Sequence, residues 1–157
     1  MPPGEYVPDS TEGITRVQDL PRPLVEHRSR SYRRRRCPHC GRGCYRDTLG
    51  HRILHDVGCL QRDRPRDLHI LYSKHRCEAC GLYFSADVAD LAPAGSHYTQ
   101  RVIATAVRLV AEDGLPYRVA SWHLWRDQRV FVPFATIQNW VEAAGKKKRR
   151  PPRNRLP

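Results

Sequence analysis

Apolar and polar positions follow two different periods along the chain, and the period changes near residue 96. Before this point, residues 51–58 and 66–76 contain alternating, β-favouring side chains, which predicts two short strands joined by a turn at Pro65. A shorter apolar run at 82–84 is a candidate third strand. The first part of the chain is therefore predicted to be a small β unit.

Beyond residue 96, apolar residues recur at helical spacing, which predicts three helices. The first helix ends near Gly114, the second is expected over 116–127, and the third over 133–144 with Gly145 as its C-terminal cap. The apolar stripe of the first helix comprises Val102, Ile103, Ala106, Val107 and Val110. We assign three tryptophans at helical spacing to the core: Trp122, Trp125 and Trp140.

The third predicted helix has a polar outer face that carries Gln138 and Asn139. Side-chain amides of this kind can bridge the N6 and N7 atoms of adenine in the major groove of DNA. Three helices with such a face on the last one favour a helix-turn-helix unit. The inward stripe of this helix is expected to comprise Ile137, Trp140, Val141 and Ala144.

Four of the six cysteines form two matching CxxC pairs. The stretch YRRRRCPHCG at 32–41 is echoed by YSKHRCEACG at 72–81: each has Tyr five residues before the first Cys, Arg immediately before it, and Gly after the second. Two such turns joined by strand-like sequence are typical of structural zinc sites, which take four tetrahedral ligands. We therefore predict a zinc ribbon that binds Zn²⁺ through Cys37, Cys40, Cys77 and Cys80.

Other interpretations of the cysteines are weaker. A redox pair needs a single CxxC at a helix start in a βαβ setting, and disulfides are rare in a reducing compartment. Four thiolates leave no coordination position for water, so the metal is expected to stabilise a fold rather than to hydrolyse a substrate. Cys44 and Cys59 are interpreted as small buried residues, although a second zinc site stays open through His51, His55, His69 and His75.

The charge of the chain indicates a polyanionic partner. There are 28 Lys and Arg against 16 Asp and Glu, a formal net charge of +12, and the excess is concentrated in 31–80 and 146–157. Such a field concentrates nucleic acid, and double-stranded DNA is the expected partner. The expected contacts are Arg33, Arg34, Arg35, Arg36, Arg42, Gln138, Asn139, Lys146, Lys147 and Lys148.

Composition also sets the expected organisation. No apolar stretch approaches the ~20 residues of a membrane-spanning helix and no apolar signal region opens the chain, so a cytoplasmic protein without a membrane partner is expected. The proline-containing N-terminus has no sustained period. The expected segments are a disordered leader (1–29), the zinc ribbon (30–86), a linker (87–96), the helix-turn-helix (97–145) and a basic disordered tail (146–157).

The motifs resemble the N-terminal region of prokaryotic insertion-sequence transposases of the DDE class. The resemblance covers about residues 28–146 and rests on CPHCG, HRCEACG, SHYTQRVIATAVRLV, LPYRVASWHLWRD and FVPFATIQNWVEAAG. It implies binding to the terminal inverted repeats of a mobile element. In such transposases a following RNase H-like domain supplies three catalytic acids; only twelve residues follow Gly145 here, so a truncated, non-enzymatic DNA-binding module is expected.

Two alternatives stay open beside this hypothesis. The same two modules suit a transcription regulator that selects a different DNA sequence. A zinc-ribbon adaptor that binds RNA or protein is a second possibility from another class. The transposase hypothesis itself allows a homodimer or an association with an intact transposase.

Overall fold

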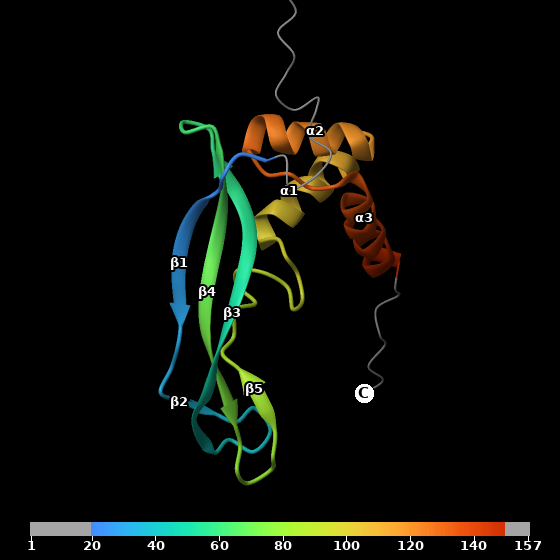
Figure 1. Cartoon of the computed structure of the whole chain (residues 1–157). Coiled ribbons are helices and arrows are strands. Elements are labelled where there is room, and N and C mark those ends of the chain that lie inside the picture. The colour runs from blue at the N-terminus through green and yellow to red at the C-terminus, as the bar shows by residue number, and fades with distance from the viewer. Residues whose placement is uncertain (1–19, 150–157) are drawn as a thin grey trace, which may run out of the picture.

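A computed structural model describes residues 20–149, which form a mixed β-sheet followed by three helices (Figure 1). The predicted α+β class is confirmed. Most of the predicted leader and the end of the predicted tail lie outside the described residues. The elements are β1 (Leu24–Arg30), β2 (Arg34–Arg36), β3 (Gly43–Cys59), β4 (Arg64–Arg76), β5 (Tyr83–Ser85), α1 (Gln100–Ala111), α2 (Tyr117–Gln128) and α3 (Phe134–Arg149).

Strands β3 and β4 form a long antiparallel hairpin that is the centre of the sheet. Both strands are longer than the sequence predicted, and β3 begins at Gly43. The turn between them lies at residues 60–63, where Asp63 has a φ of 56°. The predicted turn at Pro65 is therefore wrong. Pro65 instead lies buried at the start of β4, next to the turn, where a strand tolerates the missing N–H of proline.

The predicted end of the disordered leader at residue 29 is wrong, because residues 24–29 belong to strand β1. This strand pairs in parallel with the outer edge of β4, with Leu24 opposite Arg66 and Arg30 opposite Tyr72. The Arg64 side chain fixes the approach to the strand by donating to the carbonyl oxygens of Arg22 (2.7 Å) and Pro23 (3.2 Å). A strand that pairs in parallel with a distant strand has no hairpin turn beside it, so the local sequence pattern does not reveal β1.

Residues 87–96, predicted as a linker, pack against the sheet. Ala92 is buried with Leu54, Leu68 and Ile70 of the long hairpin, and Val88 and Leu91 cover them. Arg52 holds the end of the segment through hydrogen bonds of 2.6 Å to the carbonyl oxygens of Pro93 and Ser96. The segment therefore forms one cover of the sheet.

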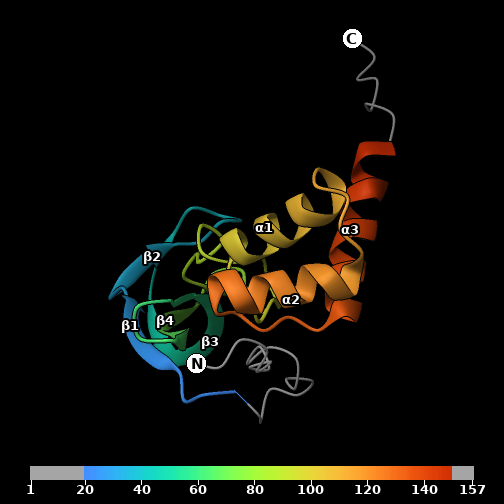
Figure 2. The same cartoon turned by 90° about the horizontal axis from the view of Figure 1, so that it is seen from above.

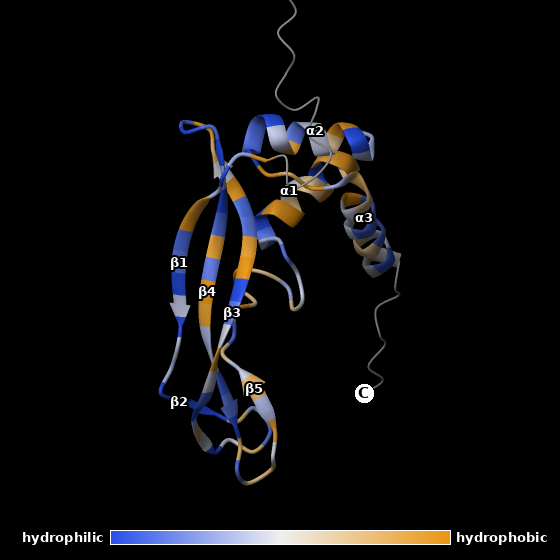
Figure 3. Cartoon of the chain, in the orientation of Figure 1, coloured by the Kyte–Doolittle hydropathy of each residue, from blue (hydrophilic) through white to orange (hydrophobic). Residues whose placement is uncertain are grey.

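The helices bury a second core beside the upper end of β3. Figure 2 shows α1 and α2 extending from the sheet, with α3 on their far side. The buried residues of this core are Val102, Ala106, Ala120, Leu124, Val130, Val132 and Ile137. Alternating hydrophobic and hydrophilic colours along β3 and β4, and the hydrophilic colour of β2, are visible in Figure 3.

Two details of the helices differ from the sequence prediction. Helix α3 continues through Gly145 to Arg149, so Gly145 is not a cap and the tail begins later than residue 146. Lys and Arg are good helix formers and are favourable at a helix C-terminus, which explains the extension. Trp125 is buried and Trp140 packs on the core, but Trp122 is 50% exposed and its assignment to the core is wrong.

A buried carboxylate joins the sheet to the helices. Asp56 of β3 is 3% exposed and accepts hydrogen bonds from Thr99 Oγ1 (2.8 Å) and Arg101 Nε (2.6 Å) at the start of α1. Next to it, His55 and residues 97–99 exchange two backbone hydrogen bonds. Gly58 lets the α2–α3 connection approach β3, because an added Cβ would lie 2.5 Å from the Arg129 carbonyl oxygen. Within residues 20–149, no helix combines the length and apolarity that a membrane crossing requires.

Candidate metal centre and its basic surroundings

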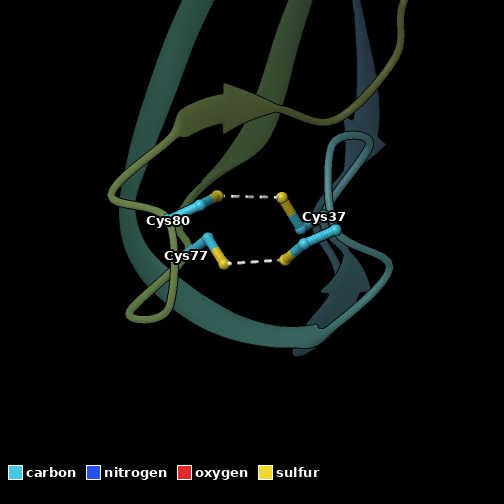
Figure 4. Close-up of side chains that lie close together, drawn as sticks. Cys37, Cys77 and Cys80 are labelled. Carbon is cyan, nitrogen blue, oxygen red and sulfur yellow. Dashed lines mark hydrogen bonds between the residues drawn. The ribbon is translucent and has the colours of Figure 1, made fainter.

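The four predicted ligands come together at the end of the sheet that lies away from the helices. Figure 4 shows Cys37 from the turn after β2 facing Cys77 and Cys80 from the turn after β4. The Sγ atoms of Cys37 and Cys80 are 3.6 Å apart, and those of Cys40 and Cys77 are 3.4 Å apart. All four Sγ atoms lie within 4.8 Å of one another. Residues forty positions apart in the sequence therefore form one cluster.

Both CxxC turns have the same backbone geometry. The Gly41 N–H donates to the Cys37 carbonyl oxygen (2.9 Å), and the Gly81 N–H donates to the Cys77 carbonyl oxygen (2.8 Å). The two glycines have φ angles of 75° and 72°, in the left-handed region that side chains other than glycine rarely adopt. The repeated sequence thus encodes a repeated structure, as its two matching halves predicted.

The dimensions of the cluster suit a tetrahedral metal ion. A Zn–S bond of about 2.3 Å places neighbouring sulfurs about 3.8 Å apart, close to the separations observed here. The first cysteine of each pair is buried, Cys37 at 2% and Cys77 at 0% exposure, whereas Cys40 and Cys80 are exposed. The four cysteines could therefore hold a metal ion, and tetrahedral sulfur sites select zinc or iron.

The thiols of the cluster differ in acidity for a physical reason. The backbone N–H of Cys80 stabilises the Cys77 thiolate and lowers the pKa of Cys77 to about 6. The backbone N–H of Cys40 acts in the same way on Cys37, whose pKa is also lowered. At Cys80 the Leu82 N–H lowers the pKa, but partial desolvation of this exposed residue and the neighbouring thiols outweigh that effect and raise the pKa to about 12. Four thiolates this close repel one another, so full ionisation requires a cation among them.

The two remaining cysteines lie outside this quartet. Cys44 is 5% exposed beside Cys37 and Cys77, and its thiol donates to the Arg42 carbonyl oxygen at 3.4 Å. Burial is the first cause of its raised pKa, which agrees with the prediction of a small buried residue. Cys59 is only half-buried at the far end of β3.

Among the residues that the structure describes, the histidines do not form a second cluster of metal ligands. His75 is buried and its two ring nitrogens contact the Cys44 carbonyl oxygen (3.0 Å) and Ser73 Oγ (2.8 Å). His55 pairs with Asp67 at 2.8 Å, and the His51 and His69 rings meet edge to face. In the part of the chain that the structure describes, the cysteine quartet is the only group of three or more such side chains close enough for one ion.

The predicted arginine contacts directly flank the first CxxC turn along the chain. Arg33, Arg34, Arg36 and Arg42 are exposed, whereas Arg35 is half-buried with its guanidinium 4.2 Å from the centroid of the Tyr32 ring. Two other arginines of the same basic block have structural partners instead, because Arg52 and Arg64 each donate to two carbonyl oxygens.

The other predicted contacts lie on α3, at the opposite end of the sheet from the cysteines (Figure 1). Asn139 is exposed, but Gln138 is half-buried and donates an amide hydrogen to Glu142 Oε1 at 3.0 Å. Lys146 is exposed on the last turns of the helix. Lys147 and Lys148 belong to the same helix. The structure thus places the predicted contacts in two separate groups.

Sequence reasoning missed several exposed aromatic residues near the cysteines. Tyr45 of β3 is 64% exposed and Tyr83 of β5 is 66% exposed. An arginine lies over each ring, Arg34 over Tyr45 and Arg76 over Tyr83. The sequence places both tyrosines close to CxxC turns, which was the available signal. Only the pairing of the strands shows that each tyrosine lies opposite an arginine.

The chain matches no known family model, no curated protein and no solved structure.

Proposed function

We propose that this chain is a zinc-dependent DNA-binding protein composed of a zinc ribbon and a helix-turn-helix unit. The observation that carries the proposal is the position of the cysteine cluster directly beside the exposed arginines of β2. Cys37 follows Arg36 without an intervening residue, so a bound ion fixes the strand that carries these guanidiniums. Arginine is suited to phosphate because its planar fork donates two parallel hydrogen bonds.

Helix α3 is proposed as the element that reads base edges. It is the last of three packed helices and its N-terminal half exposes Asn139, although residues 129–133 make the connection from α2 longer than the three- or four-residue turn usual in such a unit. Gln138 already donates one amide hydrogen to Glu142, so its contribution to base reading should be the smaller of the two. Lys146 lies where the helix would leave the groove, in a position for phosphate contact.

The proposed target is the terminal inverted repeat of a mobile element, which rests on the resemblance of the motifs to DDE-class transposases. On this proposal the chain binds element ends without cutting them, alone, as a homodimer or with an intact transposase. Selection of bound duplexes from a random pool tests the target. Enrichment of a motif that matches repeats beside the gene supports it, enrichment of a promoter motif favours a regulator, and no duplex binding favours the RNA or protein adaptor.

Point variants separate the two proposed kinds of contact. Asn139→Ala should reduce the preference for the selected sequence over random duplex, since a bidentate base contact contributes about 1–3 kcal/mol of discrimination. Arg36→Ala should weaken both duplexes alike. Arg108→Ala is the control, because Arg108 is an exposed arginine on α1 that faces Glu112. Equal losses on both duplexes for Asn139→Ala would contradict base reading by α3.

Salt dependence measures the phosphate contacts directly. If six phosphates are contacted, the logarithm of the association constant should fall against the logarithm of salt concentration with a slope of about −5. Arg36→Ala should make this slope shallower by about 1. A wild-type affinity that does not respond to salt would refute the electrostatic part of the proposal.

A further inference from the structure

Four side chains alternate in type across the strands next to the cysteine cluster: Arg34, Tyr45, Arg76 and Tyr83. Arg34 of β2 is directly opposite Tyr45 of β3, and Arg76 of β4 is directly opposite Tyr83 of β5. Tyr45 and Arg76 border the same surface hollow, which connects the two pairs. The four residues therefore form one line across β2, β3, β4 and β5, which we name the Arg–Tyr row.

The Arg–Tyr row has no role in the core of the fold. Its sequence neighbours Cys44, Cys77 and Phe84 point to the opposite side, into the small core beside the cysteine cluster. Tyr45 and Tyr83 keep about two thirds of their surface in solvent, at 64% and 66% exposure. The two rings lie in one row rather than scattered singly, so together they offer an aromatic surface to a partner.

Each tyrosine ring has a guanidinium on one side. The Arg34 Cζ atom lies 5.5 Å from the centroid of the Tyr45 ring, and the Arg76 Cζ atom lies 5.4 Å from that of Tyr83. A cation at this distance holds the ring in place and leaves ring surface free for a second planar group. The hollow beside Tyr45 is also bordered by Arg42 and Arg46, together with two acids, Asp47 and Glu78.

The spacing of the row suits a flexible strand of nucleotides. Tyr45 and Tyr83 are two strands apart, which corresponds to about 10 Å from the ~4.8 Å spacing of neighbouring strands. Arg76 is on β4, the strand between those that carry the two tyrosines, and its guanidinium over the Tyr83 ring can meet the phosphate that joins two stacked bases. In a duplex the faces of the bases are already stacked on each other, so only unpaired bases can use both rings.

We propose that the Arg–Tyr row binds single-stranded nucleic acid, with Tyr45 and Tyr83 stacking on unpaired bases while Arg34 and Arg76 contact the backbone. The proposal rests on the proposed function, since it assigns a second kind of nucleic-acid substrate to the same basic end of the molecule. Such a surface would hold a strand that has been separated from its complement, at a frayed DNA end or in RNA.

Fluorescence anisotropy with the zinc-loaded full chain tests this proposal. The probes are oligothymidine, oligouridine and a random duplex of the same length, at one salt concentration. Tyr45→Ala and Tyr83→Ala should each weaken single-strand binding roughly five- to a hundred-fold and change duplex binding less than about two-fold. Tyr45→Phe should retain single-strand affinity, because the ring is preserved. The relative affinity for the two oligonucleotides identifies DNA or RNA as the source of the unpaired bases.

Trp122→Ala is the control, since Trp122 is also an exposed aromatic residue, at 50% exposure, but it lies on α2, away from the proposed nucleic-acid contacts. It should leave single-strand binding unchanged. Failure of Tyr45→Phe to retain affinity, or equal losses on duplex and single strand, would overturn the Arg–Tyr row as a stacking surface. Intact duplex binding with unchanged single-strand binding in both alanine variants would overturn this inference alone. Absence of binding to every probe would overturn the proposed function as well.

Discussion

Replacing Asp56 with alanine should loosen the helices from the sheet and lower the free energy of unfolding by about 2–4 kcal/mol. The carboxylate is 3% exposed and accepts from Thr99, which is itself 4% exposed, so its removal leaves a buried hydroxyl without this partner. A hydrogen bond to a charged group contributes about 1.5–3 kcal/mol. The Arg101 side chain is 58% exposed, so its ion pair adds at most about 1 kcal/mol.

Asp90→Ala provides a matched control for this prediction. Asp90 also pairs with an arginine, Arg30, at 2.7 Å, but the aspartate is 56% exposed. Its removal should cost less than about 1 kcal/mol. The assay is urea unfolding of the zinc-loaded protein, followed by tryptophan fluorescence, with the slope against urea compared among variants. A loss for Asp56→Ala no greater than that for Asp90→Ala would refute the view that this buried contact joins the two parts.

Further predictions concern packing and pH. Gly58→Ala should lower the unfolding free energy by about 1–3 kcal/mol, because the added Cβ would lie 2.5 Å from a carbonyl oxygen. Gly145→Ala should raise the unfolding free energy by about 0.5–1 kcal/mol, because no atom in the described part of the chain lies within 4 Å of the added Cβ and alanine favours a helix. Thermal unfolding measures both changes. Burial would raise the pKa of Asp56, but hydrogen bonds from Arg101 and Thr99 outweigh burial and lower it. Its contribution to stability is therefore complete above the ordinary value of about 3.9 and is lost as the pH falls from there through the lowered pKa. The difference in unfolding free energy between wild type and Asp56→Asn should shrink over this range, and a constant difference would contradict the assignment. Trp125→Ala should cost about 3–5 kcal/mol and Trp122→Ala less than about 1.5 kcal/mol by urea unfolding, in keeping with 2% and 50% exposure.

The features that sequence predicted well are those with a local code. The two CxxC turns repeat the same residues at the same spacing, and the glycine after each is required by a positive φ. The stripe through Val102 and Ala106 likewise indicated the buried face of α1. Such patterns depend on the covalent chain alone, so a single sequence is sufficient to find them.

The features that sequence did not predict depend on distant partners. Strand β1 exists because the edge of β4 satisfies its backbone, and its own alternation is weak. Helix α3 passes Gly145 because the Lys and Arg residues after it are good helix formers, although glycine after a helical stripe usually indicates a cap. The Arg–Tyr row requires the register of four strands, which the positions of Tyr45 and Tyr83 in the sequence do not reveal.

The proposed role of an ion held by the four cysteines is to order the basic end of the sheet for nucleic-acid binding. Its most direct test is a zinc titration of the metal-free protein, with duplex affinity and circular dichroism recorded at each addition. Binding should increase with zinc and saturate at one ion per chain, while the helical signal of α1–α3 changes little, and Cys77→Ser should abolish the increase. Full duplex affinity in the metal-free protein, or saturation with no ion bound at Cys37, Cys40, Cys77 and Cys80, would contradict this role of the metal ion.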